Sequence, residues 1–166
     1  SVWNKFTALA VGPQAGTQPS LGDGASLHAR VVPDVVVTLE STALRAAGLS
    51  ARKCEYLKDL ALHFTEGKVH QEQWASMDDE SIIQELVAIR GIGRWTAEMF
   101  LMFHLLRPDI LPLDDLGVLK GISVNYFSGE PVTRAEARDV AEAWTPYRSV
   151  ATWYLWRSLD PVPVDY

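Results

Sequence analysis

Apolar residues recur at helical spacing through the middle of the chain, and two glycines interrupt them. Because every third or fourth residue faces the same side of an α-helix, this pattern predicts a helix, a tight turn at Gly91-Ile92-Gly93 and a second helix. The helical positions are Ile82, Leu86 and Ile89 before the turn, and Trp95, Thr96, Met99 and Phe103 after it.

The glycine turn is a candidate anion site. Gly91 and Gly93 permit a left-handed backbone and carry no side chain, so the amides that open the second helix can face an anion such as a phosphate. Arg90 and Arg94 flank the turn and add positive charge. The same turn also serves where two helices simply pack closely, so at this point both interpretations stay open.

A pair of carboxylates follows the second helix. Pro108-Asp109 breaks that helix, and Leu111-Pro112 fixes an extended segment. Asp114-Asp115 then opens a further helix through Leu119, which places Asp115 20 residues after Trp95. A carboxylate at this position is either a functional anion or a helix cap.

Most of the remaining chain is also predicted to be helical. We expect an apolar-faced helix over residues 1–10 that has no capping residue before it, and a loop over residues 12–34. Residues 35–39 are predicted to be an extended lead-in, and residues 123–131 a loop. The other predicted helices cover residues 40–47, 51–66 after Ser50, 133–144 with a capping box, and 146–159 with Tyr147, Val150, Ala151, Tyr154 and Leu155 as its core stripe.

Length and composition bound the function. The 166 residues suffice for one domain with its own core, and the formal net charge of −6 argues against a broad basic coat for nucleic acid. A hairpin that binds phosphate through backbone amides needs few lysines, so DNA stays compatible with this charge. Cys54 is the only cysteine, which excludes a disulfide framework and a four-cysteine iron–sulfur cluster and favours a reducing compartment.

Several motifs together resemble one family. They are LxxIxGIGxWTA followed by PDxxPxxDxG, with AGLSARKCEYLKDLA at residues 47–61 and WTPYRSVATWYLW at residues 144–156. Over residues 44–156 the chain resembles the helix-hairpin-helix superfamily of DNA glycosylases, and within it the 3-methyladenine DNA glycosylase II branch.

The resemblance implies an all-α fold of two lobes with the active site in the cleft between them. We expect residues 1–166 to form a single glycosylase domain whose N-terminal part is incomplete. One lobe would comprise about residues 38–113 and the other residues 1–37 with 114–166, and the cleft would contain Asp115.

The resemblance also implies a chemistry. Asp115 matches the family's catalytic aspartate, and Trp95, Trp156 and Met99 match positions of the base pocket, although some relatives place an aromatic residue where Met99 stands. Relatives that also cut the strand carry a nucleophilic lysine at the position of Trp95, so no Schiff base can form here and water is the expected nucleophile. Indole faces suit a cationic alkylated purine, since a cation–π contact is worth about 1–2 kcal/mol.

The expected partner is double-stranded DNA with damaged bases, held by the hairpin residues Arg90, Gly91, Ile92, Gly93 and Arg94. No cofactor is expected, apart from a possible monovalent cation on the carbonyls of Val87, Ile89 and Ile92. We expect a monomer without membrane contact, in the cytoplasm, at the bacterial nucleoid or in the nucleus. The favoured function is a monofunctional alkylpurine DNA glycosylase of base excision repair, and the alternative is a noncatalytic helix-hairpin-helix DNA-binding module of a repair assembly.

Overall fold

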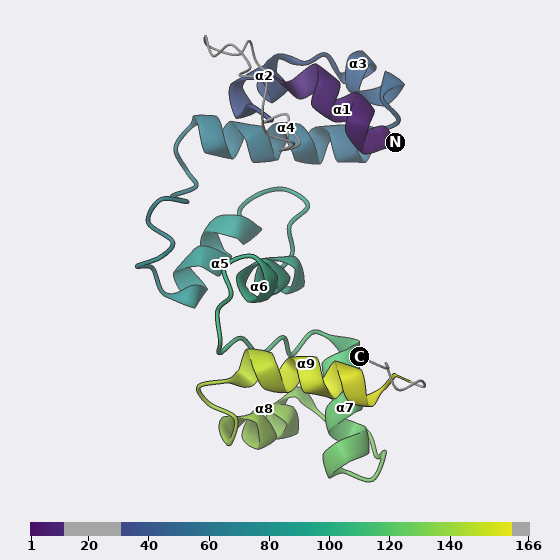
Figure 1. Ribbon diagram of the computed structural model, residues 1–166, viewed down its shortest axis with the longest axis vertical. Coiled ribbons are helices and arrows are strands. Elements are labelled where there is room, and N and C mark those ends of the chain that lie inside the picture. Colours follow the sequence, from purple (N-terminus) through teal and green to yellow (C-terminus); the bar gives the residue numbers. More distant parts are fainter. Residues whose placement is uncertain (12–30, 161–166) are drawn as a thin grey trace, which may run out of the picture. The chain divides into compact units, whose positions relative to one another are not determined.

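The computed structural model describes residues 1–11 and 31–160, which form α-helices joined by turns (Figure 1). Extended backbone pairs within these ranges only at a single bridge between Val11 and Val31. The predicted all-α class is therefore confirmed. The helices are α1 Val2–Ala10, α2 Pro33–Thr38, α3 Ser41–Ala46, α4 Ala51–Thr65, α5 Asp79–Val87, α6 Arg94–Phe103, α7 Leu116–Tyr126, α8 Arg134–Glu142 and α9 Arg148–Ser158.

The chain divides into two compact units. Unit one contains Ser1–Trp74 and Ala88–Gly91, and unit two contains Ala75–Val87 and Ile92–Tyr166. The chain thus passes from one unit to the other at the glycine hairpin. These units differ from the predicted lobes, because α1 packs against α2 and α2 against α4, and all three helices belong to a unit without residues 114–166. The cleft between two lobes stays a prediction.

Unit one is built around α4, and Figure 1 shows α1, α2 and α3 lying along it. Apolar side chains from all four helices form its core, so each of these short helices contributes one or two buried residues. The buried members of this core are Phe6, Ala10, Val36, Leu44, Cys54 and Ala61.

Unit two contains α5 to α9, and its C-terminal core lies where α7, α8 and α9 meet (Figure 1). Gly121 permits a close approach of α7 and α9, because a Cβ there would lie 2.9 Å from Cβ of Leu155. The buried members of this core are Val118, Ile122, Ala137 and Leu155.

Two expectations about unit one are corrected. Ser1 itself caps α1, since its side chain accepts a hydrogen bond from the amide of Asn4. Residues 35–38 of the segment predicted as extended belong to α2, because Pro33 stands in the first turn and Asp34 adds a favourable acid there, whereas Leu39 is extended. Burial of Val36 in the core outweighs the β-propensity of the valines. Of the predicted loop over residues 12–34, residues 12–30 lie outside the described ranges.

Two expectations about unit two are also corrected. Helix α7 continues beyond Leu119 to Tyr126, because Ile122 is buried and extends the packed face. Helix α9 begins at Arg148 rather than Pro146, and its buried side chains are Thr152 and Leu155. The other members of the predicted core stripe are exposed or half-buried, namely Tyr147, Val150, Ala151 and Tyr154.

The sequence signals at helix ends were more reliable. The Ser50 side chain caps α4, and Thr133 with Glu136 forms the predicted capping box of α8. Gly48 and Gly67 follow α3 and α4 with positive φ angles of 104° and 66°. No helix in residues 1–11 or 31–160 has the length and apolar character needed to cross a membrane.

Candidate active site

Asp115 is the N-cap residue of α7. The turn before it is fixed by hydrogen bonds from the amide of Leu113 to the carbonyl of Leu111 and from the amide of Asp115 to the carbonyl of Pro112. Oδ1 of Asp115 accepts a hydrogen bond of 2.8 Å from the amide of Val118. The carboxylate therefore satisfies a free amide of the first helical turn and lies at the positive end of the helix dipole.

Two indole groups bind the same carboxylate. Nε1 of Trp95, in the first turn of α6, donates to Oδ2 of Asp115 at 2.7 Å. Nε1 of Trp156, near the end of α9, donates to Oδ1 at 3.0 Å. The structure thus brings together the predicted catalytic residue and two of the three predicted base-pocket residues, from three different helices of unit two.

Competing effects act on the pKa of Asp115. Partial burial alone would raise it, because a charged carboxylate loses hydration. The hydrogen bonds from Trp156 and Trp95 and from the amides of Val118 and Gly117 stabilise the charged form and outweigh burial, so the pKa lies below its usual value. Asp115 is therefore an anion at neutral pH.

Two residues that sequence reasoning did not assign complete this cluster. A Cβ on Gly117 would lie 2.9 Å from Oδ1 of Asp115 and 3.0 Å from Cδ1 of Trp156, so only glycine allows the indole this position. Phe103 stacks on the ring of Trp156, with ring centroids 6.1 Å apart and an interplanar angle of 20°. The helical spacing of Phe103 after Trp95 could have indicated that both lie on one face of α6. For Gly117, the only sequence signal was its place in the PDxxPxxDxG motif.

Met99, the third predicted pocket residue, lies one helical turn after Trp95 on α6 and is half-buried. The Trp95 side chain is 46% exposed. Residues at this spacing share a helix face, so Met99 and Trp95 lie on the same side of α6.

The connection between α6 and α7 is tied to the start of α9. Arg148 donates from Nε and Nη2 to the two carboxylate oxygens of Asp109, each at 2.7 Å. Oγ of Ser149 donates to the carbonyl of Arg107 at 2.6 Å and accepts from the amide of Ile110 at 2.9 Å. These bonds fix α9, and so Trp156, relative to the segment that leads to Asp115.

The neighbouring carboxylate has a different partner. Oδ1 of Asp114 forms an ion pair of 2.7 Å with Nη2 of Arg134 on α8, and both side chains are about half exposed or more. The two adjacent aspartates are therefore distinguished by geometry, since Asp115 binds the indoles and Asp114 binds an arginine.

Arg94, predicted at the phosphate grip, is bound to protein carboxylates. Its Nη1 and Nη2 donate to Glu80 at 3.0 and 2.7 Å, and its Nε donates to Glu98 at 3.0 Å. The hydrogen bonds from Arg94 lower the pKa of Glu80 to about 2. Burial raises the pKa of Glu98 despite the same partner. This network joins α5 to α6 beside the hairpin.

The hairpin turn is held against α4 within unit one. The amide of Arg90 donates to Oδ2 of Asp59 at 2.7 Å, and the guanidinium of Arg90 lies 3.1 Å from Glu55. Gly91 has a φ of 92°, and a Cβ there would overlap the ring of Tyr56. Gly91 is thus required by backbone conformation and by contact.

The remaining hairpin residues differ from Gly91. Gly93 is the N-cap of α6 with an ordinary φ of −91°, and a Cβ there would meet nothing within 4 Å. Ile92 is half-buried.

Over the described residues, no backbone–backbone hydrogen bond outside the helices ends on the carbonyls of Val87, Ile89 or Ile92. Residues 1–11 and 31–160 contain no cluster of three or more histidine, cysteine or acidic side chains that could bind a metal ion.

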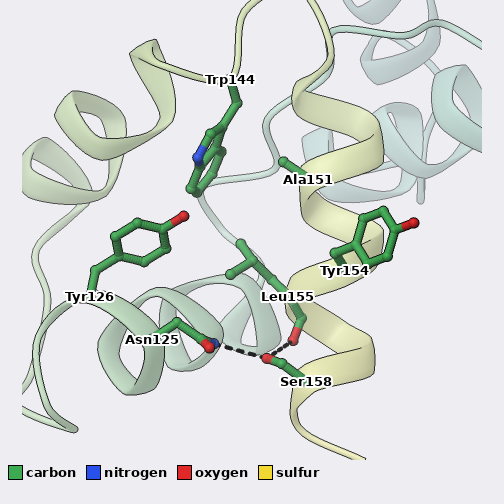
Figure 2. Close-up of a pocket in the computed structure, with 7 residues that line it drawn as sticks. All are labelled: Asn125, Tyr126, Trp144, Ala151, Tyr154, Leu155 and Ser158. Carbon is green, nitrogen blue, oxygen red and sulfur yellow. Dashed lines mark hydrogen bonds between the residues drawn. The ribbon is translucent and has the colours of Figure 1, made fainter.

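A separate cavity of about 310 Å³ lies beside α7 and α9 (Figure 2). Its lining includes Tyr126, Trp144 and Tyr154, and Nδ2 of Asn125 donates to Oγ of Ser158 at 2.9 Å. None of the predicted site residues lines this cavity.

The fold is similar to those of two solved proteins. A DNA-3-methyladenine glycosidase from Bacillus halodurans matches with a TM-score of 0.78 and 32% identity, over 95% of this chain and 65% of that chain. A 3-methyladenine DNA glycosylase from Schizosaccharomyces pombe, solved in complex with abasic DNA, matches with a TM-score of 0.69 and 30% identity, over 95% of this chain and 69% of that chain. The chain belongs to the 3-methyladenine DNA glycosylase family.

Sequence comparison agrees with this membership. DNA-3-methyladenine glycosylase 1 of Schizosaccharomyces pombe is 35% identical over 127 residues, which cover 76% of this chain and 56% of that protein. The chain spans about half the length of the curated relatives that it matches. No family model matches the chain. The family predicted from the motifs and the helix-hairpin-helix glycosylase fold are both confirmed.

Proposed function

We propose that the chain carries the catalytic site of a monofunctional DNA glycosylase, which hydrolyses the N-glycosidic bond of alkylated purines such as 3-methyladenine and 7-methylguanine in base excision repair. The observation that carries this proposal is the carboxylate of Asp115, held ionised between the indole N–H groups of Trp95 and Trp156. Membership of the 3-methyladenine DNA glycosylase family supports it.

Asp115 stabilises the transition state by its charge. Cleavage of an N-glycosidic bond gives the sugar oxocarbenium character, so a fixed anion beside the sugar lowers the barrier. Oδ1 already accepts hydrogen bonds from Val118 and Trp156, whereas Oδ2 accepts one from Trp95. Oδ2 therefore has an acceptor position left to orient the attacking water or to face the sugar.

The two indoles recognise the base by their ring faces. Both indole N–H groups are used by Asp115, so the rings offer π-electron density rather than hydrogen-bond donors. This surface attracts a purine that alkylation has made cationic, and such a base is also a good leaving group. Met99, one turn from Trp95, completes this wall of the pocket.

Water is the nucleophile. A lyase mechanism needs an amine that attacks the sugar carbon, and the residue at that position of the hairpin motif is Trp95. The side chains that bind the Asp115 carboxylate are indoles, neither of which can form a Schiff base. We therefore assign hydrolysis without strand cleavage.

The hairpin from Arg90 to Arg94 holds the DNA backbone while the damaged nucleotide rotates out of the duplex. The free amides at the start of α6 supply the grip, since Arg90 and Arg94 have carboxylate partners in the protein. We assign the carbonyls of Val87, Ile89 and Ile92 as the ligands of a monovalent cation at the same turn. The partner is double-stranded DNA bound by a monomer in the cytoplasm or nucleus.

The test is single-turnover release of purines from methylated DNA by the full chain and two matched variants. Asp115→Asn keeps the shape and a capping side chain but removes the charge, so release should fall about a hundredfold or more. Asp114→Asn removes an exposed ion pair with Arg134, and the rate of release should change by less than about threefold. Thermal melts control for folding.

Three outcomes would contradict the proposal. If Asp115→Asn remains within threefold of the parent, or if Asp114→Asn is the more damaging change, Asp115 is not the catalytic anion. If the parent binds damaged DNA without releasing any base, the chain is instead a noncatalytic helix-hairpin-helix module.

A further inference from the structure

The indole of Trp156 is held from three directions. Its N–H donates to Oδ1 of Asp115, and its Cδ1–Nε1 edge lies against Gly117 with no room for a Cβ between them. Its ring is stacked by Phe103 with a tilt of 20°. The first two contacts come from the start of α7, so Phe103 is the contact that ties the indole to α6.

Helix α6 therefore acts on both oxygens of the catalytic carboxylate. Trp95, in its first turn, donates directly to Oδ2 of Asp115. Phe103, at its last position, lies two helical turns further along and supports the indole that donates to Oδ1. A rigid helix thus sets the spacing between the two donors.

Burial does not explain Phe103. Its side chain is 59% exposed, so it removes little apolar surface from water compared with the core residues of unit two. Stacked aromatic rings attract each other beyond the area that they bury, so this contact restrains the orientation of the Trp156 ring.

We propose that Phe103 is a positioning residue for the reaction, which holds the Trp156 indole so that its N–H stays on Asp115. This inference rests on the proposed function for its catalytic consequence, but the contact itself is independent of activity. Without the stacked ring, the indole gains freedom about its side-chain bonds, and its hydrogen bond to Asp115 is made for a smaller fraction of the time.

The first experiment measures the contact directly and needs no DNA. The ¹H–¹⁵N signal of the Trp156 indole is recorded in the full chain and in Phe103→Ala, Phe103→Leu and Phe103→Trp. We expect the Ala and Leu variants to shift the signal toward that of a free indole and to speed its hydrogen exchange, while Phe103→Trp restores the parent behaviour. Tyr154→Leu, which removes another exposed aromatic residue of unit two, should leave the signal unchanged.

The second experiment measures single-turnover release of methylated purines by the same proteins. The rate should fall about fivefold to tenfold in Phe103→Ala and Phe103→Leu, with DNA binding unchanged and the rate recovered in Phe103→Trp. Melting temperatures should stay near the parent value, since the ring is exposed.

The outcomes separate the two proposals. An unchanged Trp156 signal in Phe103→Leu, or equal behaviour of the Leu and Trp variants, would overturn the positioning role whatever the activity. If the parent releases no base, the proposed function fails, and the indole signal still decides whether Phe103 holds Trp156.

Discussion

The indole nitrogen of Trp95 and Oδ2 of Asp115 are joined by a hydrogen bond of 2.7 Å that spans 20 residues of the sequence. The bond links the first turn of α6 to the N-cap of α7. Trp95 therefore has two functions in the proposed mechanism, because its ring face meets the base and its N–H stabilises the catalytic charge.

Trp95→Phe should move the acid limb of the pH–rate profile upward. The pKa of Asp115 is depressed in the folded protein, so activity that needs the anion is present above that pKa and is lost as pH falls through it. Phenylalanine keeps a ring but removes one donor to the carboxylate, so the pKa rises toward its ordinary value. The measurement is single-turnover release across acidic pH.

The matched control for this change is Trp153→Phe. Trp153 is 41% exposed, and the guanidinium of Arg157 lies 5.7 Å above its ring. This variant should leave the acid limb where it is. Equal shifts in both variants would show that Trp95 does not set the pKa of Asp115.

Gly117→Ala should damage the site without unfolding the protein. Alanine favours a helix by about 1 kcal/mol over glycine, but its Cβ would come within 2.9 Å of Oδ1 of Asp115 and 3.0 Å of Trp156. The carboxylate or the indole must move, so we expect at least about a tenfold loss of release with a melting temperature near the parent value.

Gly121→Ala is the informative comparison four residues later on α7. Its Cβ would meet Cβ of Leu155 at 2.9 Å and the carbonyl of Leu155 at 3.2 Å, so it should separate α7 from α9 and cost about 1–3 kcal/mol of unfolding free energy. The two variants are measured by thermal melts and by single-turnover release. A stable, fully active Gly117→Ala protein would contradict the described geometry.

How far the sequence predicts this site depends on the range of the interactions. Local signals identified the hairpin, the cap at Ser50 and the helix that Asp115 opens, because capping and helical spacing act over a few residues. The motif resemblance identified Trp156 as well. It did not reveal that both indoles bind Asp115, since that depends on how α6, α7 and α9 pack.

Other residues show why long-range contacts were not predicted. Arg94 was expected to contact a phosphate, but in the structure it binds Glu80 and Glu98. The pattern of charges along the sequence does not indicate which partner an arginine binds. Val36 was predicted to be extended because its neighbours in the sequence are β-branched, whereas its burial in the core with α4 favours the helix. The role of Phe103 depends on Trp156, 53 residues away, and no local rule connects the two.

The two hairpin glycines should respond differently to substitution. Gly91→Ala puts a side chain on a residue with φ of 92° and against the ring of Tyr56, so it should cost about 2 kcal/mol or more of unfolding free energy. Gly93→Ala meets no atom within 4 Å, so its unfolding free energy should change by less than about 1 kcal/mol.

DNA binding distinguishes the two glycines further. If the amides at the start of α6 hold a phosphate, Gly93→Ala should weaken binding to damaged and undamaged DNA alike. The measurement is fluorescence anisotropy at a fixed salt concentration, with thermal melts alongside. Undiminished binding by Gly93→Ala would remove the hairpin from the phosphate site.

Glu80→Gln should destabilise the protein in a pH-dependent way. The pKa of Glu80 is lowered from 4.5 to about 2 by Arg94, so its contribution is fully present above pH 4.5 and is lost as pH falls through about 2. Both side chains are about half exposed, so solvent limits the loss to at most about 1 kcal/mol at neutral pH.

The measurement for Glu80 is chemical denaturation at several pH values. The difference between Glu80→Gln and the parent should shrink as the pH falls from 4.5 toward 2. The exposed Glu72, changed to Gln, serves as control and should show no loss. A pH-independent difference would mean that packing rather than charge explains the effect.

The position of Asp115 at the start of a helix affects what its retention among relatives can reveal. An N-cap aspartate adds about 0.5–2 kcal/mol to stability, so selection for folding alone would keep it in a descendant that had lost all activity. A retained aspartate at this position is therefore not by itself evidence that a relative is active.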